Sequence, residues 1–283
     1  MVRYTRSRGF ELKLAIIPLV VALTLTQGCA NLSAIREFAD VSTESAQYTR
    51  LVTDYVGSPA RQKRYQPASQ HELLDRIAAE RAAQGERLLL RHRLIEEYMD
   101  ALGRLAADDT VTYDKELDAL GNAVKGNKFA DAKEADAFAA IAKILLKGVA
   151  DHWRQKQLKE LIAVSNEPFQ VVVDSLRVVV ENGFGSDLMN ERATIEKYCG
   201  TLIMQSSDKA GIAALQEWCD LRLSAIGARA KAIEAYTQIL RKIAEGHQRL
   251  YDGRNDLSKE LLLRDMGHDS KELQKLFNTI RTL

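Results

Sequence analysis

The sequence has little excess charge of either sign and few aromatic residues. Its 283 residues contain 40 Lys and Arg against 39 Asp and Glu, and aromatic residues make up 6%. A near-neutral balance gives no electrostatic reason to expect nucleic acid or a strongly charged membrane surface as the partner. Ala, Leu, Glu, Lys and Arg are abundant instead. This composition is typical of long helices.

The short motifs of common catalytic and metal sites are also missing. The histidines are scattered, and none stands in a His-Glu-x-x-His or Cys-x-x-Cys arrangement; they are His71, His92, His152, His247 and His268. There is no Gly-rich phosphate loop and no Gly-x-Ser-x-Gly elbow. His247 lies near an apolar helical stripe, where a lone histidine is more often a satisfied core residue than a ligand. We therefore predict no enzymatic activity, no catalytic residue, no metal and no cofactor.

The first residues read as an export signal. A basic start contains Arg3, Arg6, Arg8 and Lys13, and the apolar stretch from Leu14 to Leu25 that follows is too short to span a bilayer. A basic start followed by a short apolar core is the pattern of a secretory signal. We expect this segment to direct export and not to anchor the chain.

The end of this segment, Leu25-Thr26-Gln27-Gly28-Cys29, resembles the lipobox of bacterial lipoproteins. Gly28 stands directly before the cysteine, while Leu25 lies one place further out than the usual leucine. The resemblance implies that Cys29 becomes the lipid-carrying first residue of the mature chain. Ala30, in place of Asp, implies the periplasmic face of the outer membrane. The alternative is that Cys29 is an ordinary cysteine of an export signal or of a buried N-terminal helix.

Cleavage before Cys29 would leave residues 29–283 as one elongated helical domain. The mature chain would have 255 of the 283 residues, with 36 Lys and Arg (40 less four) and 38 Asp and Glu (39 less one), a formal net charge of −2. A chain of this length can bury a sizeable core. No Gly-rich or Pro-rich tether follows Cys29, so we expect the helices to start close to the membrane.

Apolar residues recur at helical steps along nearly the whole mature chain. We expect a first helix that ends near Gly57-Ser58-Pro59 and a long one over 69–107 with a weakness at 81–85. Shorter helices are expected over 113–124, 131–164, from 169 to Gly183, and from 186 to about Met204. Valine makes Phe169–Val173 a possible strand, but its spacing favours helix. The clearest helix spans Ile212 to Leu250, and a short pair covers 257–264 and 270–280.

Two long helices of matched length with short turns predict an all-α, antiparallel bundle with coiled-coil-like helices. A weak internal resemblance also relates two halves, about 30–126 and 127–283. At a constant offset of 138, Ile95, Tyr98, Leu102 and Tyr113 recur as Ile233, Tyr236, Leu240 and Tyr251. Either the chain is duplicated, or two amphipathic helices of one period match by chance.

Cys199 and Cys219 are candidates for a disulfide, because an exported protein meets an oxidising compartment. The turn at Ser206–Asp208 lies between them, so antiparallel helices would bring both sulfurs to the same height. The alternative is two buried free thiols.

The two tryptophans have different expected roles. Trp218 lies beside Cys219 near the apolar stripe, which favours packing. Trp153 follows His152 in a polar stretch, so it could rest half-exposed and serve as an interaction anchor.

These observations predict a lipid-anchored envelope protein that acts as a binding, adaptor or scaffold protein. Its partners would be membrane lipid, through Cys29, and another envelope protein. A first alternative is a periplasmic immunity lipoprotein that neutralises a toxin. The alternative of another class is a cell-wall hydrolase or metal-dependent enzyme, which would need scattered His and carboxylate residues to meet in one cleft.

Overall fold

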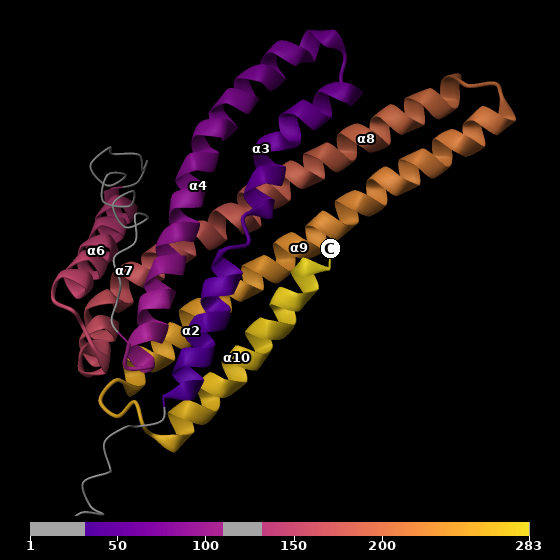
Figure 1. The fold of residues 1–283 in the computed structure, drawn as a ribbon. Coiled ribbons are helices and arrows are strands. Elements are labelled where there is room, and N and C mark those ends of the chain that lie inside the picture. Colours follow the sequence, from indigo (N-terminus) through magenta and orange to yellow (C-terminus); the bar gives the residue numbers. More distant parts are fainter. Residues whose placement is uncertain (1–31, 110–131, 283) are drawn as a thin grey trace, which may run out of the picture. The chain divides into compact units, whose positions relative to one another are not determined.

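The computed structural model describes residues 32–109 and 132–282, and these residues form a bundle of helices without a strand (Figure 1). The all-α prediction is therefore confirmed. The helix expected over 113–124 lies outside the described residues.

The first hairpin consists of two short helices that run out and one long helix that returns. Helix α2 spans Ser33–Ala46 and α3 spans Arg50–Gln62. The 3₁₀ turns η1 (Lys63–Tyr65) and η2 (Ala68–Gln70) lead into α4, His71–Ala106. Helix α4 packs mainly against α2 and α3. It continues without interruption through 81–85, where a weakness was expected.

The first helix does not end at Pro59 as predicted: Pro59 lies inside α3, and the break falls at residues 47–49. Proline has no N–H, so it leaves the carbonyl of Tyr55, four residues earlier, without its helical donor. Arg81 of α4 donates to that carbonyl oxygen from Nη1 at 3.2 Å. A distant arginine thus supplies the hydrogen bond that the proline removes.

In the second hairpin, α7 and α8 run out and the long helix α9 returns, while α6 precedes them. Helix α6 spans Ala132–Ala150, and the 3₁₀ turn η3 (Gln155–Gln157) leads into α7, Leu158–Val178. A π-helix, η4 (Val179–Phe184), joins α7 directly to α8, Gly185–Gln205. The long helix α9, Lys209–Gly253, returns along α8 and α7, and α10 spans Glu260–Arg281.

Three predicted helix boundaries in this half are wrong. The helix expected over 131–164 breaks after Ala150, where His152 adopts a positive φ of 49°. The break expected before Phe169 is absent, because Pro168 lies inside α7, where Phe169, Val172 and Val173 are at most 1% exposed and their packing outweighs the proline. The end expected at Gly183–Gly185 is replaced by the π-helix.

Helix α9 and its start are confirmed. Asp208 caps it, accepting hydrogen bonds from the backbone N–H groups of Ala210 at 3.2 Å and Gly211 at 2.8 Å.

The expected C-terminal pair of helices is instead one helix, α10. Asp269 occupies its buried stripe and is paired with Arg249 of α9, with Nη2 to Oδ1 at 2.7 Å. A polar residue in the stripe therefore does not interrupt the helix.

The main core extends from α2, α4 and α10 across α9 to α7 and α6. The two long helices pack mainly against interrupted partners: α4 against α2 and α3, and α9 against α7, α8 and α10. Tyr98, Tyr236 and Phe38 are among the largest fully buried side chains.

Replacing Gly246 by Ala is expected to destabilise the protein. A Cβ at Gly246 would lie 2.4 Å from Cζ of Phe38, whose ring is fully buried between α2 and α9. Overpacking of this kind costs about 1–3 kcal/mol. Gly227→Ala in the same helix is the matched control: nothing lies within 4 Å of its Cβ, so it should gain about 0.5–1 kcal/mol from helix propensity. Urea denaturation of both variants measures the difference, and two stabilised variants would contradict the packing of α2 on α9.

Candidate functional site

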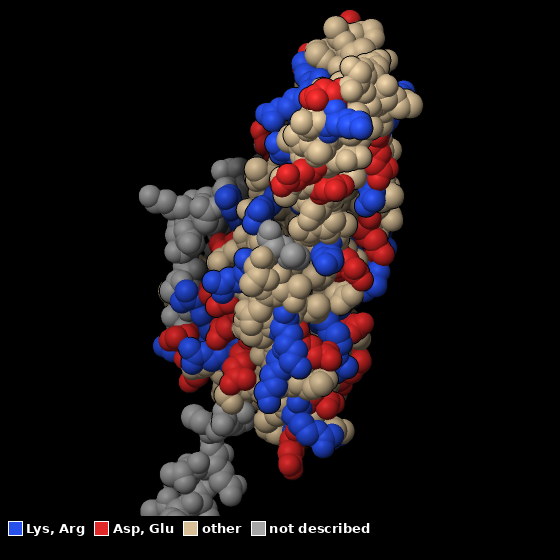
Figure 2. Space-filling view, turned by 90° about the vertical axis from the view of Figure 1, so that its right-hand side faces the viewer, with Lys and Arg blue, Asp and Glu red and all other residues tan. Residues whose placement is uncertain are grey.

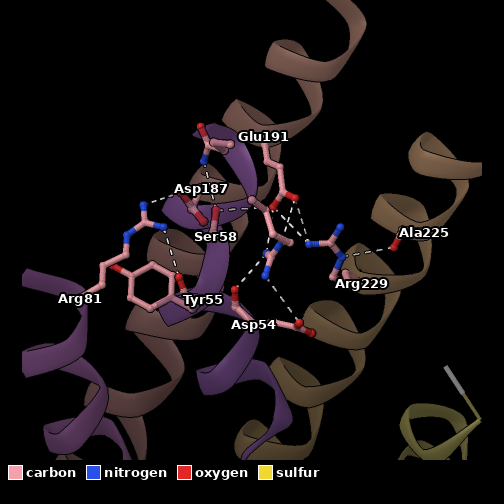
Figure 3. Close-up of polar contacts among 10 residues, drawn as sticks. Asp54, Tyr55, Ser58, Arg81, Asp187, Glu191, Ala225 and Arg229 are labelled. Carbon is pink, nitrogen blue, oxygen red and sulfur yellow. Dashed lines mark hydrogen bonds and ion pairs between the residues drawn. The ribbon is translucent and has the colours of Figure 1, made fainter. Parts of the chain in front are cut away.

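A buried ionic cluster joins the two hairpins where α3, α4, α8 and α9 meet (Figure 3). Helix α8 supplies two carboxylates one turn apart, Asp187 and Glu191, which are 7% and 1% exposed. They share a buried stripe with Phe184, Leu188 and Ile195. Ionised carboxylates at such positions need charged or hydrogen-bonding partners.

Glu191 is held by two arginines from different helices. Arg61 of α3 donates from Nε to Oε1 and from Nη2 to Oε2, both at 3.0 Å. Arg229 of α9 donates from Nη1 to Oε2 at 3.1 Å, and the Ser58 hydroxyl lies 3.4 Å from the same oxygen. Burial alone would raise the pKa of Glu191, but the hydrogen bonds and charge of Arg61 and Arg229 outweigh it and lower the pKa below its ordinary value.

Asp187 is paired with Arg81 of α4. The Arg81 guanidinium also lies over the Tyr55 ring, 4.5 Å from its centroid. That ring stacks on Phe184 at the end of the π-helix, with centroids 4.4 Å apart. Figure 3 shows Asp187, Arg81 and Tyr55 between the helices of both hairpins.

The cavity beside this cluster has a volume of about 20 Å³, lined by residues that include Leu51, Asp54 and Ile233. Such a volume holds one water molecule. Since both oxygens of Glu191 already accept hydrogen bonds, the arrangement acts as a clasp that holds α8 against α3 and α9. This cluster was not predicted from the sequence. The available signal was a pair of acids, four residues apart, on an otherwise apolar stripe.

Two tyrosine–histidine pairs lie in the core. The Tyr98 hydroxyl is 2.5 Å from Nε2 of His247, and His247 Nδ1 is 3.0 Å from Oδ1 of Asn166. The amide nitrogen of Asn166 donates to Gln248, so its oxygen faces the ring. The Tyr98 hydroxyl also lies 2.6 Å from Oγ of Ser165. Desolvation lowers the pKa of His247 to about 3. The core position predicted for His247 is confirmed, at 0% exposure.

The second pair joins Tyr236 of α9 to His92 of α4. His92 Nδ1 lies 2.9 Å from the carbonyl oxygen of Ala46 and 3.0 Å from the Tyr236 hydroxyl. The carbonyl can only accept, so Nδ1 carries the proton. Nε2 is buried without a hydrogen-bond partner in the described part of the chain. Desolvation, helped by the charge of Arg91 and opposed by the bond to Ala46, lowers the pKa of His92 to about 4.

Cys199 and Cys219 lie at disulfide distance, with the two Sγ atoms 2.08 Å and the Cα atoms 6.3 Å apart. Both are buried, at 5% and 4% exposure, and they join α8 to α9. Trp218 packs beside them with Tyr65 and Tyr198. The expected pairing of the two cysteines and the packing role of Trp218 are thus present in the structure.

Removing this bridge is expected to loosen the outer part of the α8–α9 hairpin. The cysteines are 20 residues apart, and closing a loop of that size stabilises by about 3 kcal/mol on the chain-entropy estimate. The Cys199→Ser, Cys219→Ser variant should therefore lose up to about 3 kcal/mol of unfolding free energy. Urea denaturation and amide exchange measure it, with the reduced wild type as a comparison. Unchanged exchange at 200–218 would contradict a stabilising bridge.

The half-exposed position expected for Trp153 is wrong, because Trp153 is only 4% exposed. The chain reverses at His152, and the Trp153 backbone N–H donates to the carbonyl of Gly148 at 2.9 Å. Its ring packs against Gly148, where a Cβ would lie 3.4 Å from the ring. Trp153 therefore fills the corner between α6 and α7 and presents no interaction surface.

Other predicted features carry no assembled site. Cys29 lies outside the described residues. Over 32–109 and 132–282, no three His, Cys, Asp or Glu side chains gather as metal ligands, and no helix is both long and apolar enough to cross a membrane.

On the face seen in Figure 2, basic and acidic side chains of the described residues are interspersed. No family model, curated protein or solved structure matches the chain.

Proposed function

We propose that the protein is a lipid-anchored component of the bacterial envelope that acts by binding another envelope component. The observation that carries the proposal is the combination of the lipobox-like ending at Cys29 with a buried cysteine pair at disulfide distance. Disulfides form and persist in exported proteins, and are rare in the reducing cytosol. The pair therefore agrees with the compartment to which the N-terminal segment would send the chain.

The use of the buried charges supports binding over catalysis. Glu191 and Asp187 are neutralised by arginines from other helices, and so is Asp269. Glu134 of α6 is paired in the same way with Arg91 of α4, with Nη2 to Oε2 at 2.7 Å. Carboxylates paired in this manner hold helices together. These ion pairs stabilise the helical bundle, and the surface of the bundle would bind the partner.

The anchor would hold this body close to the membrane. Helix α2 begins at Ser33, four positions after Cys29. Four residues span at most about 14 Å when fully extended. A partner would therefore be met at the membrane surface.

Affinity capture from crosslinked envelopes tests this function. The anchored protein and a Cys29→Ala form are purified under identical conditions, and the recovered proteins and polysaccharides are identified by mass spectrometry. We expect a stoichiometric partner that is lost with the anchor. Recovery of the bait alone would overturn the binding role, and recovery of a secreted toxin would replace the adaptor by an immunity protein.

A further inference from the structure

A polar groove of about 850 Å³ lies between the turn that follows α3 and the outward face of α8. The turn contributes Arg64, Tyr65 and Gln66, and α8 contributes Thr194, Lys197 and Tyr198. Sites for small ligands have volumes of about 300–1,000 Å³, so this groove has room for an extended ligand. It is separate from the buried clasp.

The charges that line the groove are of one sign. Arg64 and Lys197 are both exposed, and neither forms an ion pair or side-chain hydrogen bond with any residue that the structure describes. Among the residues that the structure describes, no carboxylate lines the groove. Their neighbours on the same elements are paired, Arg192 with Glu196 at 2.8 Å and Lys63 with Asp75. Two unpaired cations in a concave surface favour an anionic ligand.

The remaining wall consists mostly of amides and hydroxyls. Gln66 Nε2 donates to Thr194 Oγ1 at 3.2 Å, which links the turn to α8. Asn190, Thr201 and Gln205 continue the same lining along α8. Amide and hydroxyl groups both donate and accept hydrogen bonds, so they suit a ligand rich in hydroxyl groups, which does the same.

Aromatic rings stand beside these polar groups and hold the wall in place. Tyr65 and Tyr198 meet edge to face, with centroids 5.5 Å apart, and both contact Trp218. Cys199 follows Tyr198 and joins α8 to α9. The negative face of a tyrosine ring attracts polarised C–H groups such as those of a sugar ring. A wall that is already fixed loses little entropy on binding.

We propose that this groove binds an anionic oligosaccharide, with Arg64 and Lys197 on its acidic groups and the tyrosines and amides on its sugar rings. The assignment deepens the proposed binding role and rests on it. An acidic peptide would satisfy the two cations, and its backbone would pair with the amides, but it would offer no sugar ring to the faces of Tyr65 and Tyr198.

The test is calorimetric titration of the mature protein in non-ionic detergent with three probes. Tetragalacturonate carries both sugar rings and carboxylates, chitotetraose is a neutral sugar, and tetraglutamate is a charged peptide. We expect tetragalacturonate to bind at least tenfold more tightly than either other probe, and more weakly as salt rises. No binding of tetragalacturonate, or equal binding of tetraglutamate or chitotetraose, would overturn the proposal.

Variants locate the binding in the groove. Arg64→Gln combined with Lys197→Gln should weaken tetragalacturonate binding at least tenfold. Lys271→Gln removes an exposed lysine of α10 outside the groove and should leave it unchanged. Equal losses in both variants would overturn the site. A failed titration beside successful capture from envelopes would remove the groove assignment alone, whereas failed capture would remove the proposed function.

Discussion

Lowering the pH from 7 to 5 is expected to reduce the free energy of unfolding by about 4 kcal/mol, about 2 from each of His92 and His247. Both rings are fully buried, and burial lowers their pKa to about 4 and about 3. In the unfolded chain they would titrate near the ordinary value of 6.5. A total stability of about 5–15 kcal/mol is typical of a folded protein, so this loss is large.

The free energy of unfolding falls at lower pH because the unfolded chain binds more protons than the folded chain. Between pH 6.5 and pH 5 the unfolded chain binds a proton at each histidine and the folded chain does not, so stability falls as the pH falls. Their contribution is fully present above pH 6.5 and is lost progressively toward the folded pKa values. Protonation of His92 in place would bury a charge on Nε2, which has no hydrogen-bond partner in the described structure.

Urea denaturation at pH 7, 6 and 5 measures this dependence. His247→Gln and His92→Gln should each remove about half of the change in unfolding free energy between pH 7 and pH 5, whatever their effect on the stability at pH 7. His268→Gln is the control, because that side chain is 71% exposed. A wild-type stability that is the same at pH 7 and pH 5 would contradict burial of the two rings in neutral form.

Replacement of Glu191 by Ala is expected to destabilise the protein by about 3 kcal/mol. The change leaves the guanidinium groups of Arg61 and Arg229 without their shared carboxylate. Breaking a buried ion pair costs about 3–5 kcal/mol, and the lower end applies here because Arg61 and Arg229 are 29% and 22% exposed and can be partly solvated.

The matched control is Glu196→Ala, five residues further along α8. Its ion pair with Arg192 is about half exposed, and such pairs contribute about 0–1 kcal/mol. Chemical denaturation gives both values, and amide exchange shows whether α3 and α8 open together. Equal losses in the two variants would show that the cluster is not a clasp between the hairpins.

The sequence was sufficient for the helical architecture because apolar spacing reports which face of a helix is buried. The stripe of α9 is confirmed, as is the helical assignment of Phe169–Val173. The cysteine pair could also be foreseen, because a short turn between antiparallel helices sets the height of both residues.

The boundaries could not be foreseen, since they depend on contacts between residues far apart in sequence. Pro59 stays helical because Arg81 donates to the carbonyl of Tyr55. Asp269 stays in the stripe of α10 because Arg249 neutralises it. The same holds for Asp187 and Glu191, whose role as a clasp exists only when α3, α4 and α9 supply the arginines.

The internal resemblance at an offset of 138 stays a prediction, and the structure gives it a geometric basis. The related residues Tyr98 and Tyr236 are both fully buried. Each hydroxyl contacts a histidine of the other long helix. In both hairpins, an interrupted outgoing helix packs against an uninterrupted return helix. Duplication of one hairpin would produce such an arrangement.

The clasp has a structural role, and the polar groove has the proposed binding role. Glu191 and Asp187 hold the hairpins together, while Arg64 and Lys197 remain available for a ligand. The cysteine pair connects the two, because it fixes the part of α8 that carries Tyr198.

The intact mass of the protein recovered from membranes, with the N-terminal peptide sequenced by mass spectrometry, shows whether Cys29 carries lipid. We expect a chain that begins at Cys29 and carries acyl groups, and a Cys29→Ala form without them. A membrane-bound chain that still begins at Met1, or a mature chain with an unmodified Cys29, would contradict the lipid anchor and the envelope function built on it.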